Sequence, residues 1–282
     1  MFTDTGFRLA GFTFAWYSVL VVVGAWVAAL LAARLAKRTG LKPERVWQAL
    51  IPASILSLVG ARLWFVCFPP QSVVANGRTA DWLLRNFFDL NQGAVTVWLG
   101  GLGILGGMAG GVVGLWLYTR LTKQPLLPWL DIAAVVFPLA QAIGRLGNGI
   151  NQELYGPVTQ LPWGMPVTIE AQRVAPYTDL TTYPLATTLF HPVFLYESLL
   201  CITIFGGMLA LWLRWRSQFR AGELTLIYLT LYGAGRFLLE FWRVNVSLIA
   251  NVNISQAVSL ALAVGSLVLL VVRARQTTSQ SA

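Results

Sequence analysis

Residues 129–156 read WLDIAAVVFPLAQAIGRLGNGINQELYG, a long apolar run that ends in a cluster of polar and ionisable side chains. A helix needs about 20 mostly apolar residues to cross the hydrocarbon core of a bilayer, at about 1.5 Å per residue. The first part of this stretch therefore predicts a membrane-spanning helix. Arg145 and Glu153 follow near its end, and ionisable side chains at membrane depth are costly and usually functional.

Apolar runs of similar length recur along the chain. We expect seven membrane-spanning helices, over residues 12–33, 48–68, 96–118, 129–150, 192–213, 223–243 and 254–272. Of the 282 residues, 56% are hydrophobic and 11% are charged, whereas about 25% of the residues in an average soluble domain are charged. The predicted fold class is all-α: a polytopic membrane protein in which residues 1–282 form a single integral membrane domain.

Two longer segments lie between the predicted helices, over residues 69–95 and 151–191. They contain Asn, Asp, Pro, Thr and aromatic residues rather than the low-complexity composition of a flexible linker. We therefore expect both segments to form ordered caps outside the membrane.

The distribution of Lys and Arg predicts how the chain is oriented. Alternate loops and the C-terminal tail hold 12 of these residues on one side, and the loops of the other side hold 5. Short loops rich in Lys and Arg stay in the cytoplasm, which places the N-terminus outside, the C-terminus inside and residues 151–191 in an extracytoplasmic cap. The same bias explains most of the net charge of +9, so no nucleic-acid partner is expected.

Glycines crowd the third predicted helix. They are Gly100, Gly101, Gly103, Gly106, Gly107, Gly110, Gly111 and Gly114. Small residues allow transmembrane helices to pack closely, which is our main interpretation. The alternative is that a lipid or substrate approaches the exposed backbone, which glycine also permits.

Ionisable residues inside the predicted spans indicate a functional site. Arg236 and Glu240 lie four residues apart and share one helix face with Tyr232. A self-neutralising ion pair would explain their presence, but apolar residues would serve insertion better, because buried pairs rarely gain net stability. Glu197, in the fifth span, needs a cationic or hydrogen-bonding partner, and the arginines are candidates.

The segment around Arg145 has a different character. Gly147 and Gly149 weaken a helix, so we expect the chain to unwind here and to line a substrate pocket at the outer membrane surface. Asn148 and Asn151 offer amide donors, and the planar guanidinium of Arg145 suits a phosphate group.

In these residues and in several further sequence elements, the chain resembles the prolipoprotein diacylglyceryl transferase family. Members of this family are bacterial membrane enzymes that lipidate lipoprotein precursors. The matching elements are Trp16-Tyr17, Gly60-Ala61-Arg62, Gly144 to Gly156, His191-Pro192 with Leu195-Tyr196-Glu197, and Tyr232-Gly233-Ala234 with Arg236, Glu240 and Arg243. The Gly144 to Gly156 element is the signature of the family, and the match covers most of the chain.

The resemblance implies a reaction and its partners. The diacylglyceryl group of phosphatidylglycerol would move to the thiol of a lipobox cysteine in a prolipoprotein, forming a thioether and releasing glycerol phosphate, in the bacterial cytoplasmic (inner) membrane. No cofactor is expected, because the lipid donor carries the transferred group. With two cysteines and one histidine in the chain, no metal site is expected either.

The resemblance also implies roles for individual residues. The expected catalytic residues are Arg145 and Arg236 at the lipid phosphate, Glu153 and Glu240 orienting the arginines, and Tyr17 and Tyr232 supplying hydroxyl groups. The expected substrate-binding residues are Arg62, Asn148, Asn151, Gly156, His191 and Glu197, of which Glu197 would also orient the arginines.

One departure from the family concerns the base that ionises the thiol. The family carries a histidine just before a Gly-Gly pair in the third span, whereas this chain has Leu105 before Gly106 and Gly107, and leucine accepts no proton. Glu153, His191 or a tyrosinate are the possible substitutes. The alternative functions are a noncatalytic paralogue that binds anionic phospholipid or the lipoprotein precursor, and a transporter, which the missing internal repeat disfavours.

Overall fold

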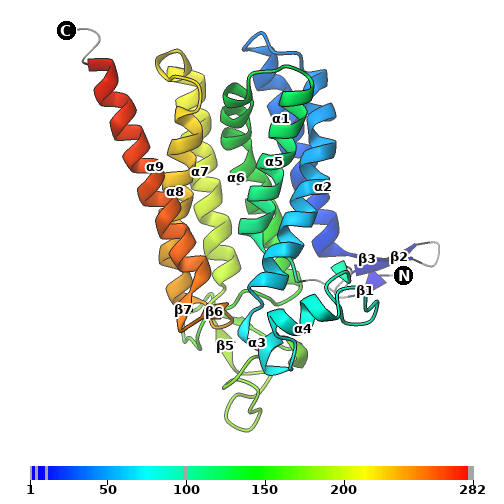
Figure 1. The fold of residues 1–282 in the computed structure, drawn as a ribbon. Coiled ribbons are helices and arrows are strands. Elements are labelled where there is room, and N and C mark those ends of the chain that lie inside the picture. Colours follow the sequence, from blue (N-terminus) through cyan, green and yellow to red (C-terminus); the bar gives the residue numbers. More distant parts are fainter. Residues whose placement is uncertain (1, 4–5, 10–11, 98–100, 279–282) are drawn as a thin grey trace. The chain divides into compact units, whose positions relative to one another are not determined.

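The structure is a computed structural model, and it describes residues 2–3, 6–9, 12–97 and 101–278. Seven long helices within these ranges are apolar enough to cross a membrane. They are α1 (Trp16–Lys37), α2 (Glu44–Cys67), α5 (Ile104–Leu121), α6 (Leu126–Ile150), α7 (Val193–Trp215), α8 (Glu223–Leu239) and α9 (Ile254–Thr278) (Figure 1). The predicted all-α, seven-helix membrane fold is confirmed.

The first and third helices begin later than predicted. Residues before α1 form a three-stranded antiparallel sheet of β1 (Phe2–Thr3), β2 (Gly6–Leu9) and β3 (Phe12–Ala15). Before α5, the Arg62 guanidinium binds the carbonyl oxygens of Gly93, Ala94 and Gly101. The helix α5 itself begins at Ile104 rather than at residue 96.

The chain divides into two compact units. The first contains residues 1–31, 133–244 and 258–282, and the second contains residues 32–132 and 245–257. The divisions fall inside α1, α6 and α9. The expectation of a single integral membrane domain stays a prediction.

The second unit is organised by the contact between α2 and α5 (Figure 1). A Cβ atom on Gly106 would lie 2.2 Å from the carbonyl oxygen of Gly60, and one on Gly110 would lie 2.0 Å from that of Leu56. Only glycine fits at such distances, so the two backbones touch directly. This confirms the prediction that glycine permits close helix packing.

Residues 69–95 form part of the second unit and are folded, as predicted. They contain the short helices α3 (Gln71–Ala75) and α4 (Ala80–Arg85). Val66, Leu83 and Ala94 form a small apolar core beneath them. The hairpin of β6 (Leu248–Ile249) and β7 (Val252–Asn253) belongs to the same unit.

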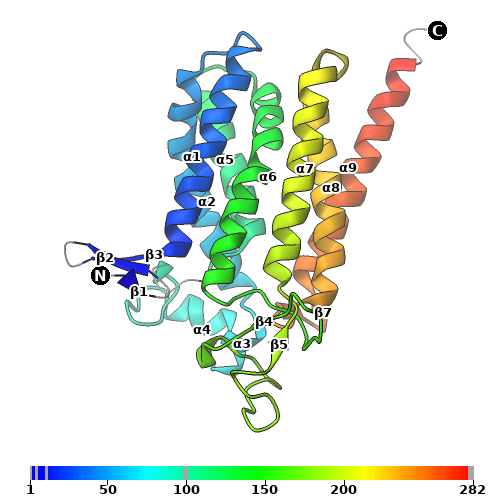
Figure 2. The same ribbon diagram turned by 180° about the vertical axis from the view of Figure 1, so that it is seen from behind.

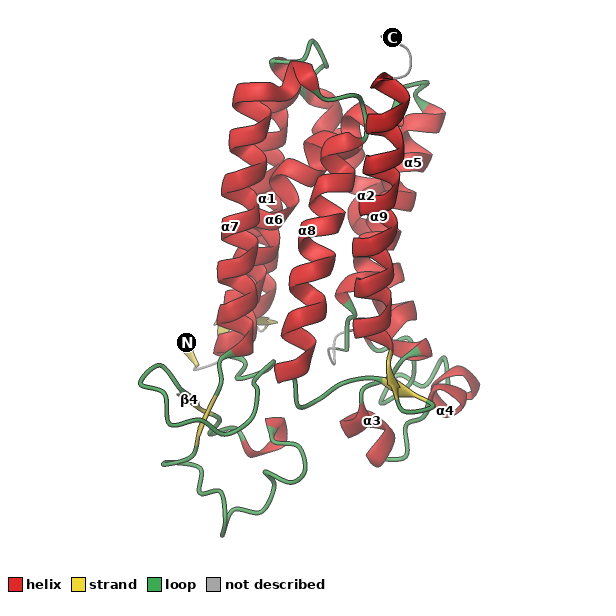
Figure 3. Ribbon diagram, turned by 90° about the vertical axis from the view of Figure 1, so that its left-hand side faces the viewer, coloured by secondary structure: helices red, strands yellow, loops and turns green. Residues whose placement is uncertain are grey.

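In the first unit, α8 lies between α7 and α9 (Figure 3). A Cβ atom on Gly233 would lie 2.8 Å from the carbonyl oxygen of Ser259 in α9, and one on Gly235 would lie 2.4 Å from the Leu200 side chain in α7. Two glycines on one helix therefore bring both neighbours close. The helix α8 is followed directly by a 3₁₀ turn, η4 (Glu240–Trp242), which carries Glu240, one of the predicted site residues.

Residues 151–191 fold beyond the N-terminal end of α7 (Figure 2). They contain the two-stranded sheet of β4 (Met165–Pro166) and β5 (Leu189–Phe190) and the turn η2 (Glu170–Gln172). Tyr155, Val167 and Phe190 form their core. The segment is thus ordered, as predicted, whereas its position outside the cytoplasm stays a prediction.

Candidate active site

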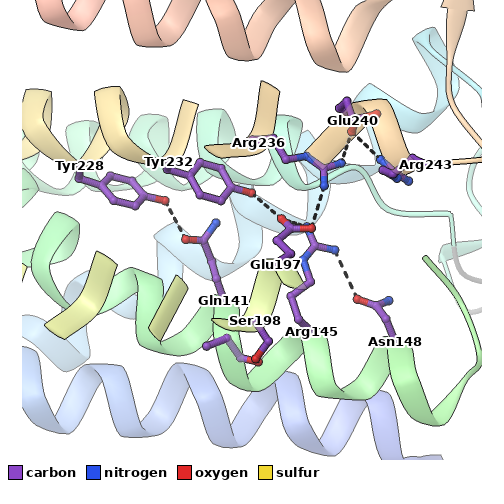
Figure 4. Close-up of polar contacts among 11 residues, drawn as sticks. Gln141, Arg145, Asn148, Glu197, Ser198, Tyr228, Tyr232, Arg236, Glu240 and Arg243 are labelled. Carbon is purple, nitrogen blue, oxygen red and sulfur yellow. Dashed lines mark hydrogen bonds and ion pairs between the residues drawn. The ribbon is translucent and has the colours of Figure 1, made fainter. Parts of the chain in front are cut away.

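The polar residues of α6, α7 and α8 meet around the carboxylate of Glu197 (Figure 4). Glu197 is buried, with only 1% of its surface exposed. Its Oε1 atom accepts hydrogen bonds from Arg145 Nη2 at 2.8 Å and from the Tyr232 hydroxyl at 3.0 Å. Its Oε2 atom accepts one from Arg236 Nη1 at 2.7 Å. Glu197 therefore joins two arginines that are 91 positions apart in the sequence.

A second carboxylate extends this chain of charges. Glu240 forms ion pairs with Arg236 in α8 and with Arg243, whose Nη1 atom lies 2.8 Å from Glu240 Oε1. The order of contacts is Arg145, Glu197, Arg236, Glu240, Arg243, which we call the charge chain. Counted over these five residues alone, the guanidinium groups outnumber the carboxylates by one.

The charge chain is more than the self-neutralising pair considered for Arg236 and Glu240. The two residues do pair, but each also contacts a further charged residue. Desolvating several charges costs free energy that apolar residues would not require. The charge chain contains one more guanidinium than carboxylate groups. In a low-dielectric setting, this excess positive charge suits the binding of an anion.

At the Arg145 end, the network continues into the segment after α6. Arg145 Nη1 donates to Asn148 Oδ1 at 3.3 Å, and Asn148 Nδ2 donates to Glu153 Oε2 at 3.0 Å. Asn151 Nδ2 donates to the other carboxylate oxygen, Oε1, at 3.2 Å. Glu153 thus contacts two amides, one of which links it to Arg145, and its role in orienting the arginines stays a prediction.

The environment of Glu153 raises the pKa of its carboxyl group. Burial is the largest cause, since it penalises the charged form. The hydrogen bonds from Asn148 and Asn151 and the charge of Arg145 act in the opposite direction, but they do not cancel the effect of burial.

The prediction that the helix unwinds at Gly147 and Gly149 is wrong, because α6 continues to Ile150. A Cβ atom on Gly147 would lie 2.8 Å from the ring of Tyr17, and one on Gly149 would lie 2.4 Å from the ring of Phe194. The two glycines give room to neighbouring aromatic rings within a regular helix. Irregular backbone begins only at Asn151.

Tyr17, near the start of α1, lies beside this end of α6. It is half-buried, and its phenol is close enough to Arg145 and Glu153 to interact with both charges. Eight of the predicted site residues are joined by hydrogen bonds and ion pairs into one network, which Tyr17 borders. They are Arg145, Asn148, Asn151, Glu153, Glu197, Tyr232, Arg236 and Glu240.

Gly156 and His191 belong to a neighbouring network. The amide of Gly156 donates to the carbonyl oxygen of His191 at 2.8 Å, and a Cβ atom on Gly156 would lie 2.6 Å from the carbonyl oxygen of Trp242. The Nδ1 atom of His191 shares a hydrogen bond with the Tyr196 hydroxyl at 3.0 Å, and that hydroxyl accepts another from Trp163.

Arg62 lies in the second unit, where its guanidinium binds backbone carbonyls and the hydroxyl of Thr96. Its contacts tie α2 to residues 93–96 and to Gly101. Leu105 is buried in α5 of the same unit.

The sequence prediction did not include Gln141 and Tyr228. The Tyr228 hydroxyl donates to Gln141 Oε1 at 2.8 Å, and both residues are buried (Figure 4). Gln141 lies one turn before Arg145, and Tyr228 lies one turn before Tyr232, so each shares a helix face with a predicted site residue. Their four-residue spacing from Arg145 and Tyr232, within apolar spans, is the sequence feature from which they could have been predicted.

Comparison with known proteins matches nearly the whole chain to one family. The sequence profile of the family described as "Prolipoprotein diacylglyceryl transferase" matches residues 5–272. A phosphatidylglycerol–prolipoprotein diacylglyceryl transferase of Chloroflexus aggregans is 40% identical over 243 residues, which are 84% of this chain and 74% of that protein. The protein of the same name from Thermotoga maritima is 35% identical over 259 residues, 91% of this chain and 80% of that protein. The one from Enterococcus faecalis is 36% identical over 272 residues, 95% of this chain and 90% of that protein.

Proposed function

The chain belongs to the prolipoprotein diacylglyceryl transferase family, and from that premise we propose how its residues carry out the transfer. The protein is a membrane transferase that moves the diacylglyceryl group of phosphatidylglycerol to the thiol of a prolipoprotein cysteine. A carbon–sulfur bond forms, a carbon–oxygen bond to the phosphate breaks, and glycerol phosphate leaves.

The observation that carries the assignment of residues is the excess charge of the charge chain. Its three guanidiniums and two carboxylates leave one positive charge, and the phosphodiester of phosphatidylglycerol carries one negative charge. Arginine remains charged when buried and matches phosphate geometry with paired donors. Arg145 and Arg236 hold the phosphate, and Glu197 and Glu240 hold the two guanidiniums in position.

Bond cleavage increases the charge that these arginines compensate. The donor is a monoanion, whereas the departing glycerol phosphate is a phosphomonoester that carries close to two negative charges at neutral pH. Donors that are fixed before the reaction stabilise such developing charge without reorganising. The hydroxyl of Tyr232 restrains Glu197, and Tyr17, Asn148, Asn151 and Gly156 shape the side of the pocket that faces the acceptor.

A further substrate contact comes from His191, which lies just before α7, next to the backbone of Gly156. The Arg62 guanidinium binds the backbone of Gly93 and Ala94, so any part that it has in substrate binding is indirect.

The protein sits in the bacterial cytoplasmic membrane with its N-terminus outside and its C-terminus in the cytoplasm. The distribution of Lys and Arg between alternate loops supports this orientation. Residues 151–191 then form a cap on the outer face, on the side from which an exported precursor would approach Glu153.

The experiment that tests the function compares lipid donors. Purified protein is reconstituted in liposomes of phosphatidylglycerol or of zwitterionic phosphatidylcholine, and a lipobox peptide is analysed by mass spectrometry. We expect a diacylglyceryl mass gain on cysteine with phosphatidylglycerol only. Equal transfer from both lipids would contradict the role of the excess positive charge. No transfer, together with a Leu105→His variant that is active, would indicate a noncatalytic paralogue.

A further inference from the structure

Glu153 differs from the other two carboxylates of the site in what it contacts. Glu197 and Glu240 are each ion-paired with two arginines. Over the described ranges, no ion pair includes Glu153, and its two oxygens accept hydrogen bonds from the neutral side chains of Asn148 and Asn151 instead. Paired arginines make a carboxylate a poor proton acceptor, whereas amide donors fix its position at a much smaller loss of basicity. Glu153 is therefore free to accept a proton.

The backbone presents Glu153 in an unusual conformation. Gln152 and Leu154, its two neighbours, both have φ of 55°, in the left-handed region that non-glycine residues rarely adopt. Such conformations persist where the surrounding structure enforces them, and they concentrate at functional sites. Here the Gln152 side chain accepts hydrogen bonds from the backbone of Thr168 and Ile169, and the carbonyl of Leu154 accepts one from Phe194.

The position of Glu153 also meets the requirements of proton transfer. The residue is only partly buried, so an incoming thiol can reach it. Arg145 from α6 and Tyr17 from α1 are the charged and titratable groups that face it. Asn148 links its carboxylate to the guanidinium of Arg145. An anionic donor held at Arg145 adds negative charge nearby, which raises the proton affinity of Glu153 further.

We propose that Glu153 is the general base that removes the thiol proton of the acceptor cysteine. The proposal rests on the transferase function given above. The S–H bond breaks and its proton goes to the Glu153 carboxylate, while the sulfur electron pair forms the new bond to the glyceryl carbon. The carbon–oxygen bond breaks, and its electrons leave with glycerol phosphate. That monoester has a second pKa of about 6, so it accepts the proton from Glu153 and restores the carboxylate.

His191, the other basic candidate, lies in a different hydrogen-bond network. Its Nδ1 atom is engaged with Tyr196, which also accepts a hydrogen bond from Trp163. In the described part of the chain, no side-chain hydrogen bond or ion pair joins that network to Arg145, Asn148 or Glu153. The geometry thus favours Glu153 over His191.

The test uses Glu153→Gln, which keeps the shape of the side chain and removes its basicity. Transfer is measured with a lipobox peptide and with the same peptide carrying selenocysteine, whose selenol is already ionised at neutral pH and needs no base. We expect kcat/KM for the cysteine peptide to fall by about 10²–10⁴-fold. The selenocysteine peptide should react within a few-fold of the wild-type rate. Glu170→Gln, the same change at an exposed residue of the 151–191 segment, is the matched control.

Two outcomes with the variant would overturn the assignment. Glu153→Gln could transfer to the cysteine peptide as fast as wild type, or it could fail with both peptides while phosphatidylglycerol still protects it from thermal unfolding. The second result would indicate a structural role. Wild-type protein that transfers to neither peptide would contradict the proposed function itself, and this assignment with it.

The pH dependence of the wild-type enzyme gives an independent readout if the variant does not fold. A base must be ionised, so the rate falls as pH falls through its pKa. Because burial raises the pKa of Glu153, we expect the acidic limb of kcat/KM above about 4.3, the ordinary value for Glu, and well below about 8.5, that of a free thiol. A single limb near 8.5 would mean that the thiol ionises without a base and would overturn the proposal.

Discussion

At the scale of single residues, three hydrogen-bond donors stabilise the negative charge of Glu197. Arg145, Arg236 and Tyr232 all bind a carboxylate that is 1% exposed. Glu197 also separates two guanidiniums that would otherwise repel each other in a low-dielectric interior. Glu197 therefore allows the two arginines to lie close together, and the proposed binding of a phosphate depends on that arrangement.

Glu197→Gln should destabilise the protein strongly. The substitution leaves two buried guanidiniums without their shared carboxylate, and breaking a buried ion pair from one side costs about 3–5 kcal/mol. Asp81→Asn makes the same acid-to-amide change in the exposed Asp81–Arg85 pair, where about 0–1 kcal/mol is expected. Unfolding of both variants in the same detergent measures the difference, and equal stabilities would contradict the buried charge chain.

Residue types and spacing predicted which residues form the site, but not how they contact one another. Arg236 and Glu240 were found from their four-residue spacing. Glu197 was predicted to need an arginine, yet nothing in the sequence indicates that it binds Arg145 and Arg236 at once. The sequence also does not indicate that Glu153 accepts hydrogen bonds from Asn148, near the end of α6, and from Asn151, just after it.

At the scale of helices, glycine decides how closely backbones approach. α2 and α5 touch at Gly60 and Gly106 and again where Gly110 meets Leu56. The other glycine effect was not predicted: Gly147 and Gly149 remain helical because aromatic rings fill the space beside them. Propensity favours unwinding at glycine, and tertiary packing overrides it here. The start of α5 at Ile104 was not predicted either, because hydropathy alone does not mark where a helix begins.

Gly110→Ala and Gly111→Ala form a matched pair that tests this packing. A Cβ atom at position 110 would lie 2.0 Å from the Leu56 carbonyl oxygen, whereas one at position 111 finds its nearest neighbour at 3.9 Å. Both variants gain helix propensity, worth about 1 kcal/mol. Only Gly110→Ala should pay about 1–3 kcal/mol for overpacking. Thermal unfolding in detergent should therefore rank Gly111→Ala above Gly110→Ala, and the reverse order would refute the contact.

At the scale of the whole molecule, the membrane composition of the sequence accounts for most of the architecture. Seven apolar runs were predicted and seven long apolar helices are present in the described ranges. Hydropathy works well here because a bilayer admits few spanning structures other than helices. The two longer segments proved to be folded, but their short strands and helices depend on contacts that hydropathy does not record.

Labelling of single cysteines tests the proposed orientation. In a background without Cys67 and Cys201, Thr187→Cys and Ser217→Cys place a thiol at exposed positions in the 151–191 segment and after α7. A membrane-impermeant maleimide added to intact cells should label position 187 and leave position 217 unlabelled until the membrane is opened. The opposite pattern would invert the topology inferred from Lys and Arg.

We propose that the charge chain holds the phosphate of the lipid donor as the carbon–oxygen bond breaks. The most direct measurement is the rate of diacylglyceryl transfer in phosphatidylglycerol liposomes by Arg236→Ala and by Arg85→Ala, an exposed control. Removing a preorganised donor to a developing anion typically costs about 10²–10³-fold in rate. We predict at least that loss for folded Arg236→Ala and a wild-type rate for Arg85→Ala. A folded Arg236→Ala protein that transfers at the wild-type rate would contradict the account.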